Sequence, residues 1–282
     1  MNNLKTALLL GLMSGVLLVG GQAIGGRGGL YTGLLLAAAM NFVGYFFSDK
    51  IALTMYSARP VTPAENGEVY ARVGPLTQNL CLRMELPMPK LWLISEDSPN
   101  AFATGRNPAH ASVAFTAGLL QLMNDRELEA VIAHELGHVK HRDILISSVA
   151  ATIAAAITML ARMAFFFGGR RDEEEEGGGV VGGVLMLILA PIAAVLIQMA
   201  ISRTREYAAD AAAARYTGSP SGMIAGLDKL ECWSKRIPLH ASPATAHMFI
   251  IQPFTGSSMM RLFSTHPSTA ERIARLQRLT FA

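Results

Sequence analysis

The residues best placed to do chemistry are His134, Glu135 and His138, which form an H-E-x-x-H pentapeptide. Histidines four residues apart lie on one face of an α-helix, so both imidazoles can bind the same metal ion, and Glu135 can reach a water molecule bound to it. This pattern is typical of zinc hydrolases. The alternative is a pair of core histidines, because so short a motif also occurs by chance in unrelated helices.

A helix-start signal precedes this motif. Asn124 can cap a helix, and Glu127 follows three residues later, as in a capping box. Apolar residues then occupy most of positions 128–132. The sequence therefore predicts that a helix carries the two histidines.

The composition indicates a membrane protein. Of the 282 residues, 51% are hydrophobic and 16% are charged, and the apolar residues are concentrated in long runs. Cys81 and Cys232 are too few for a disulfide framework and show no C-x-x-C spacing, which favours a reducing compartment. The net charge of +3 comes with dispersed lysines and arginines, so no nucleic-acid partner is expected.

Four apolar runs have about the length needed to cross a bilayer. They lie at about residues 6–24, 30–47, 144–167 and 180–201. We expect the first two to form a hairpin over residues 1–47 and the last two to form a second hairpin over residues 144–201. A cleaved signal peptide is the alternative for the first run. The acidic run at residues 172–176, inside the second hairpin, is expected to be a solvated loop.

Two polar blocks remain, residues 48–143 and residues 202–282, and we expect them to assemble one catalytic domain. In the first block, extended segments at about residues 90–94, 101–104 and 112–115 predict a small antiparallel sheet next to the histidine helix. In the second block, a capping-box pattern that begins at Ser268 predicts a last helix.

A catalytic zinc ion needs three protein ligands, so one is still missing. A pair of His138 and His141 is an alternative, but it would leave Glu135 without a water molecule to activate. On an ideal helix, Asp143 would lie about 140° around from His138, too far to bind the same ion. The acidic run at residues 172–176 would lie a membrane thickness of about 30 Å away.

Glu206 meets the requirement on topological grounds. It follows the fourth apolar run, so two membrane crossings return it to the side on which His138 lies. Asp210 stands four residues further on, where it can accept a hydrogen bond from the free nitrogen of a liganding histidine. The sequence therefore favours Glu206 as the third ligand.

Nearly the whole chain resembles the HtpX membrane endopeptidases, which are relatives of the CAAX prenyl protease among the gluzincins. Three segments and one dipeptide carry the resemblance. They are Asn-Ala-Phe-Ala-Thr-Gly at 100–105, Glu-Leu-Glu-Ala-Val-Ile-Ala-His-Glu-Leu-Gly-His at 127–138, Ser-Arg-Thr-Arg-Glu-Tyr-Ala-Ala-Asp at 202–210, and His266 with Pro267. The implied fold is a mainly α membrane protein with four transmembrane helices and a zincin-like α+β catalytic domain.

The resemblance also implies roles for individual residues. The ligands of one zinc ion per chain would be His134, His138 and Glu206, with Glu135 as the catalytic base. An edge strand that pairs with the substrate backbone would be formed by Asn100, Ala101, Phe102 and Ala103. The first candidate for a second donor to the tetrahedral intermediate is His266, ahead of Arg205, His240 and His247.

The expected activity is hydrolysis of peptide bonds in unfolded or misfolded membrane proteins, in membrane protein quality control and the stress response. The polar blocks contain nine and ten lysines and arginines, respectively. Together with the resemblance, these positive charges imply a protein of the bacterial inner membrane whose active site faces the cytoplasm. The alternatives are a non-catalytic zinc-binding scaffold or holdase and a processing enzyme for prenylated C-termini. The intact Glu135 argues against the scaffold, since a structural zinc site needs no base.

Overall fold

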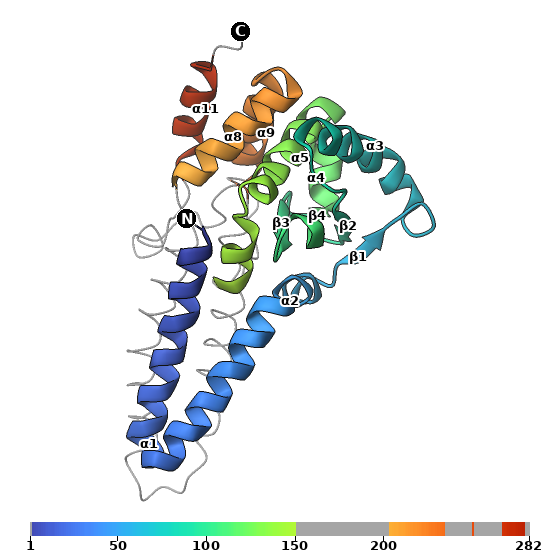
Figure 1. Ribbon diagram of the computed structural model, residues 1–282. Coiled ribbons are helices and arrows are strands. Elements are labelled where there is room, and N and C mark those ends of the chain that lie inside the picture. The colour runs from blue at the N-terminus through green and yellow to red at the C-terminus, as the bar shows by residue number, and fades with distance from the viewer. Residues whose placement is uncertain (1, 151–202, 235–249, 251–266, 280–282) are drawn as a thin grey trace, which may run out of the picture.

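The computed structural model describes residues 2–150, 203–234, 250 and 267–279 (Figure 1). Several expectations fall outside these ranges. They concern most of the third apolar run, the whole of the fourth, the acidic run at residues 172–176, and the side chains of His240, His247 and His266.

Helix α1 (Asn2–Phe46) is folded back on itself at Gly26, where φ is +54°. Glycine adopts this left-handed conformation without steric cost, so the chain can reverse there. Figure 1 shows the two arms (blue) diverging from the bend. Between the arms, Nδ2 of Asn41 donates a hydrogen bond to Oγ of Ser14 at 2.9 Å. The helix is therefore a hairpin.

One described segment, Gly26–Phe46, is long and apolar enough to cross a membrane, as judged by length and composition. The apolar part of the first arm, Thr6–Val19, is shorter than such a span. Within the described ranges the expectation of four membrane-crossing helices is thus met by one segment, and the other three remain predictions.

The sheet is mixed and has four short strands, in the order β1-β2-β4-β3. They are β1 (Arg59–Val61), β2 (Lys90–Ile94), β3 (Ala101–Gly105) and β4 (Ala111–Thr116). Strands β2 and β4 are parallel, whereas β1 with β2 and β3 with β4 are antiparallel. The sheet is not the purely antiparallel one expected from the sequence. The chain passes from β2 to β3 at the far edge and then returns as β4, which lies between β2 and β3. As a result, β3 lies at an edge.

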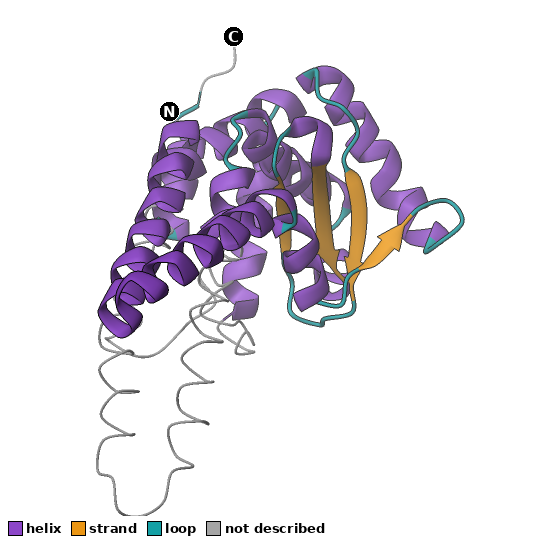
Figure 2. Cartoon of the chain, turned by 60° about the horizontal axis from the view of Figure 1, so that its bottom comes forward, coloured by secondary structure: helices purple, strands orange, loops and turns teal. Residues whose placement is uncertain are grey.

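Helices cover both faces of this sheet (Figure 2). Helix α2 (Ser48–Met55) packs on one face, where it meets Phe102, and α5 (Asp125–Lys140) packs on the other, where it meets Ala103. The remaining helical elements are α3 (Gly67–Met84), η1 (Pro108–His110), α4 (Ala117–Leu122), α8 (Arg203–Thr217), α9 (Ser221–Ser234) and α11 (Thr269–Gln277). Helix α5 is central, since it packs on α3, α8, α9 and β3.

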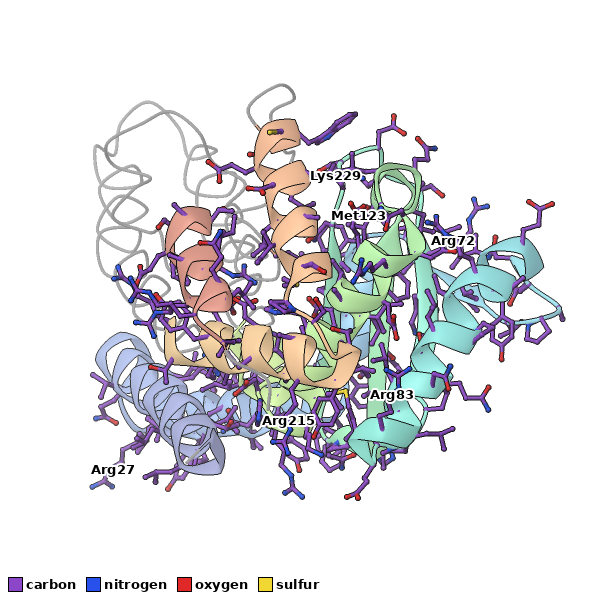
Figure 3. The ribbon with its side chains drawn as sticks, turned by 90° about the horizontal axis from the view of Figure 1, so that it is seen from above. Arg27, Arg72, Arg83, Met123, Arg215 and Lys229 are labelled. Carbon is purple, nitrogen blue, oxygen red and sulfur yellow. The ribbon has the colours of Figure 1, made fainter. Side chains whose placement is uncertain are left out.

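The predicted capping box fixes the start of α5. Oδ1 of Asn124 accepts from the N–H of Glu127 at 3.0 Å, and Oε2 of Glu127 accepts from the N–H of Asn124 at 2.9 Å. Two cations from other helices hold the same junction, because Lys229 donates to Glu127 at 2.7 Å and Arg72 pairs with Asp125 at 2.7 Å (Figure 3). The helix that carries the histidines therefore begins at a defined residue.

Gly29 provides a test of the hairpin, because a Cβ at this position would overlap the carbonyl oxygen of Gly21 in the other arm. We expect Gly29→Ala to push the arms apart and to cost about 1–3 kcal/mol of stability, as overpacking typically does. The measurement is disulfide formation between cysteines introduced by Ser14→Cys and Asn41→Cys, which should fall. Gly15→Ala is the control, since a Cβ there would meet nothing within 4 Å. Equal crosslinking in both variants would contradict this packing.

Candidate metal centre

Three side chains from two helices form a group that could hold a metal ion. His134 and His138 of α5 and Glu206 of α8 each offer one ligand atom, and these atoms all lie within 4.8 Å of one another. The two Nε2 atoms are 3.3 Å apart, and they lie 3.7 and 3.6 Å from carboxylate oxygens of Glu206. Ligands of a tetrahedral zinc ion, with bonds of about 2.0–2.1 Å, are themselves about 3.3 Å apart. The three side chains therefore fit zinc with little movement.

Each histidine is held at its other ring nitrogen by a carboxylate. Nδ1 of His134 lies 2.9 Å from Asp210, and Nδ1 of His138 lies 3.2 Å from Asp143. An Nδ1–H that donates to a carboxylate fixes the plane of the ring and leaves Nε2 free to bind a metal. Both Nε2 atoms consequently face Glu206.

Asp143 reaches His138 because α5 ends before it. Arg142 has a left-handed backbone, with φ of +57°. The N–H of Arg142 donates to the carbonyl of Val139 at 3.1 Å, and the N–H of Asp143 donates to the carbonyl of His138 at 2.9 Å. These two bonds define a Schellman motif, which turns the chain back over the last helical turn. The ideal-helix angle of about 140° does not apply, because it assumes that the helix continues.

Glu135 lies between α5 and the edge of the sheet. It is buried, and its Oε2 accepts a hydrogen bond from the backbone N–H of Ala103 at 2.8 Å. Burial raises the pKa of Glu135, and nearby His134 and His138 oppose this effect. One backbone donor of β3 thus orients the carboxylate next to the histidines.

The structure brings the backbone N–H of Ala103 to Glu135, whereas the side chains of Phe102 and Asn100 make other contacts. The ring of Phe102 points to the opposite face of the sheet, where its centroid lies 5.6 Å from that of Tyr56. Asn100 precedes the strand, and its side-chain Oδ1 accepts a hydrogen bond from the N–H of Ile250 at 3.1 Å. These two predicted residues therefore have structural contacts of their own.

Sequence reasoning missed Arg272, which lies on α11. Its side chain is 1% exposed, and its Nε and Nη2 atoms donate to Asp210 at 2.8 and 2.6 Å. Burial alone would raise the pKa of the Asp210 carboxyl, but Arg272 and His134 lower it below its ordinary value. A signal was present in the sequence, because Arg272 stands one helical turn before Leu276, in the apolar stripe of this helix.

Known proteins match this chain over most of its length. A family model described as "Peptidase family M48" matches residues 63–280. Relatives named "Protease HtpX homolog" include those of Desulforapulum autotrophicum, 50% identical over 98% of this chain and 89% of the relative, and Thermodesulfovibrio yellowstonii, 51% identical over 98% of both. The sequence matches confirm the resemblance inferred from the motifs.

A solved structure also aligns with the chain. The crystal structure of S. mikatae Ste24p matches 98% of this chain with 18% identity and a TM-score of 0.47. This chain spans 65% of the length of that protein.

The pH dependence of zinc binding follows from the surroundings of His138. Burial lowers its pKa, but the hydrogen bond to Asp143 and the nearby Glu206 and Glu135 carboxylates raise it to about 9. In the metal-free protein this imidazole is therefore protonated at pH 7, and zinc must displace the proton. We expect the apparent zinc affinity, measured by competition with a chelator, to rise about tenfold per pH unit from about pH 7 to 9 and then to level off.

Asp143→Asn is the matched variant for this measurement. Because Asp143 contributes strongly to the raised pKa of His138, the affinity should level off at a lower pH in the variant than in the parent. Asp228→Asn, on the exposed side of α9, should leave the profile as it is. A profile that Asp143→Asn does not move would show that this carboxylate does not control His138.

Proposed function

The chain belongs to peptidase family M48, and from this premise we propose that it is a zinc-dependent membrane endopeptidase in which His134, His138 and Glu206 hold one zinc ion. Membership of the family makes the protein a metalloprotease, a hydrolase of peptide bonds. The observation that carries the zinc assignment is the convergence of these three side chains at 3.3–3.7 Å with Glu135 beside them.

The residues around the site have complementary roles in the proposed reaction. Zinc bound there would lower the pKa of a water molecule and polarise the scissile carbonyl. Glu135 accepts a proton from the attacking water at Oε1 and later donates it to the leaving amine. Its Oε2 is held by the N–H of Ala103 at 2.8 Å, which keeps the carboxylate from turning away. Asp210 and Asp143 hold the two histidines with Nε2 toward the metal.

The substrate class is inferred from β3. As an edge strand it can pair with any extended polypeptide through backbone hydrogen bonds. The N–H of Gly105 lies 3.3 Å from Oγ of Ser148, and the N–H of Ala103 is bound to Glu135, so the backbone of Ala101 and the carbonyl of Ala103 are left for the substrate. A short site that recognises backbone suits unfolded or misfolded membrane proteins, and we include their quality control under stress in the proposal.

A second donor to the developing oxyanion completes the proposed mechanism. His266 remains the first candidate, followed by His240 and His247, and all three lie outside the described residues. Arg205 lies within them. Its buried Nη1 atom has no hydrogen-bond partner among the described residues, since Asp143 is 3.7 Å away, so it has a donor to offer to a substrate oxygen.

The proposed location is the bacterial inner membrane, with several spans and the active site facing the cytoplasm. Supporting observations are the apolar helix at Gly26–Phe46 and the lysines and arginines of the two polar blocks. We also propose that residues 48–143 and 202–282 form one catalytic domain. The packing of α5 from the first block against α8 from the second supports this assembly.

Glu135→Gln should abolish cleavage without loss of the metal, because only the base is removed. General acid–base catalysis contributes about 10²–10⁴-fold, so we expect cleavage of casein to fall at least about 100-fold while the zinc content stays at one per chain. The control is Glu129→Gln on the same helix, whose partly exposed side chain pairs with Arg83. If Glu135→Gln cleaves as fast as the parent, Glu135 is not the base of the reaction, whereas a parent protein that binds zinc and cleaves nothing would favour the zinc-binding scaffold or holdase.

Glu206→Gln tests the third ligand, because a neutral amide replaces a charged carboxylate. We expect zinc affinity to fall more than about 100-fold, beyond the 10–100-fold typical of a lost outer contact, as measured by chelator competition. Asp228→Asn is again a suitable exposed control. Zinc retention equal to that of the parent would remove Glu206 from the ligand set and direct attention to His266.

A further inference from the structure

Arg272 is buried next to the metal centre although it comes from α11, far from the histidines in the sequence. It is the largest fully buried side chain in the described part of the protein, and its Nη2 comes within 3.5 Å of the His134 ring. Figure 1 shows α11 beside α8, on the far side of which α5 lies. A cation in this place needs partners, and it has them.

The guanidinium binds Asp210 with two parallel hydrogen bonds. Nε donates to Oδ2 at 2.8 Å, and Nη2 donates to Oδ1 at 2.6 Å. The same Oδ1 atom accepts from Nδ1 of His134 at 2.9 Å. A carboxylate that accepts two parallel hydrogen bonds from a planar guanidinium cannot rotate about its Cβ–Cγ bond, so the position of Oδ1 is fixed. The orientation of the His134 ring is fixed with it.

A third hydrogen bond fixes the guanidinium itself. Nη1 of Arg272 donates to the carbonyl of Ile250 at 2.7 Å, and the N–H of Ile250 is held by Asn100 at 3.1 Å. Nη1 is also 3.8 Å from Glu206, which is too long for a hydrogen bond. The bond to Ile250 therefore keeps the cation directed at Asp210 and away from the proposed metal ligand.

We propose that Arg272 is a positioning residue of the metal centre, which acts through Asp210 to set the orientation of His134. This inference rests on the proposed function, since it requires that the centre binds zinc. A lysine in the same place would keep the charge but replace the planar fork and its three donor nitrogens by a single ammonium group. Arg272 therefore supplies three donors in a fixed arrangement as well as a positive charge.

A double-mutant cycle on the full-length protein in detergent tests the proposal. The variants are Arg272→Lys, Asp210→Asn and the double variant, with Arg275→Gln as the control on the same helix, where the side chain is 57% exposed. Zinc affinity is measured by chelator competition, and the melting temperature of each zinc-free protein shows that it is folded. We expect Arg272→Lys to weaken zinc binding about 10–100-fold, as is typical when a group that orients a metal ligand is lost, and Arg275→Gln to leave zinc binding unchanged.

The cycle also identifies the route of the effect. Because Arg272 acts through Asp210, Arg272→Lys should change the zinc affinity less than about threefold when Asp210→Asn is already present. Multiplicative losses in the double variant would overturn the proposal, as would parent-like zinc affinity in a folded Arg272→Lys protein. Loss of folding in Arg272→Lys would assign the residue to the stability of the fold instead. A parent protein that binds no zinc would refute the proposed function itself, which is a different result.

Discussion

The close packing of α5 against α8 is the constraint on which the candidate site depends. A Cβ at Gly137 would lie 3.2 Å from the Cα of Ala209 and 3.3 Å from the Cβ of Ala212, so small residues on both helices are needed for this approach. The histidines come from one helix and Glu206 from the other. A shift of a few tenths of an ångström between the two helices at Gly137 therefore changes the distance from Glu206 to the two histidines.

The second constraint is the balance of buried charge. Four buried carboxylates surround the two histidines, and an unpaired buried carboxylate is costly. They are Glu135, Asp143, Glu206 and Asp210. Backbone, imidazole and guanidinium groups donate hydrogen bonds to these carboxylates. Glu135 accepts from the N–H of Ala103, Asp143 accepts from His138, and Asp210 accepts from Arg272 and His134. A divalent cation bound among these buried carboxylates would offset part of their negative charge.

Sequence reasoning agrees with the structure where the signal is local and, for Glu206, where counting membrane crossings constrained the meeting of distant segments; it failed where no such constraint was available. The capping box at Asn124 and the histidine spacing are local patterns, and both are found in α5. Glu206 was identified from an argument about topology, and the structure places it beside both histidines. The mixed sheet could not be predicted, because strand order depends on a crossover that no spacing encodes. Asp143 was rejected as a metal ligand and lies outside the group that could hold the ion, but its contact with Nδ1 of His138 was missed, because the left-handed backbone of Arg142 leaves no mark in the sequence.

The Schellman turn after α5 has a consequence for where this protease can work. Asp143 is the last polar residue before the third apolar run, so His138 is separated from that run by only a few residues. Six residues span at most about 20 Å even when fully extended. With residues 144–167 crossing the bilayer, as proposed, the metal centre is tethered close above the lipid surface. In this proposed arrangement, a polypeptide segment that emerges from the bilayer would be within reach of the metal centre, whereas a polypeptide that its own folded domain holds away from the membrane would not.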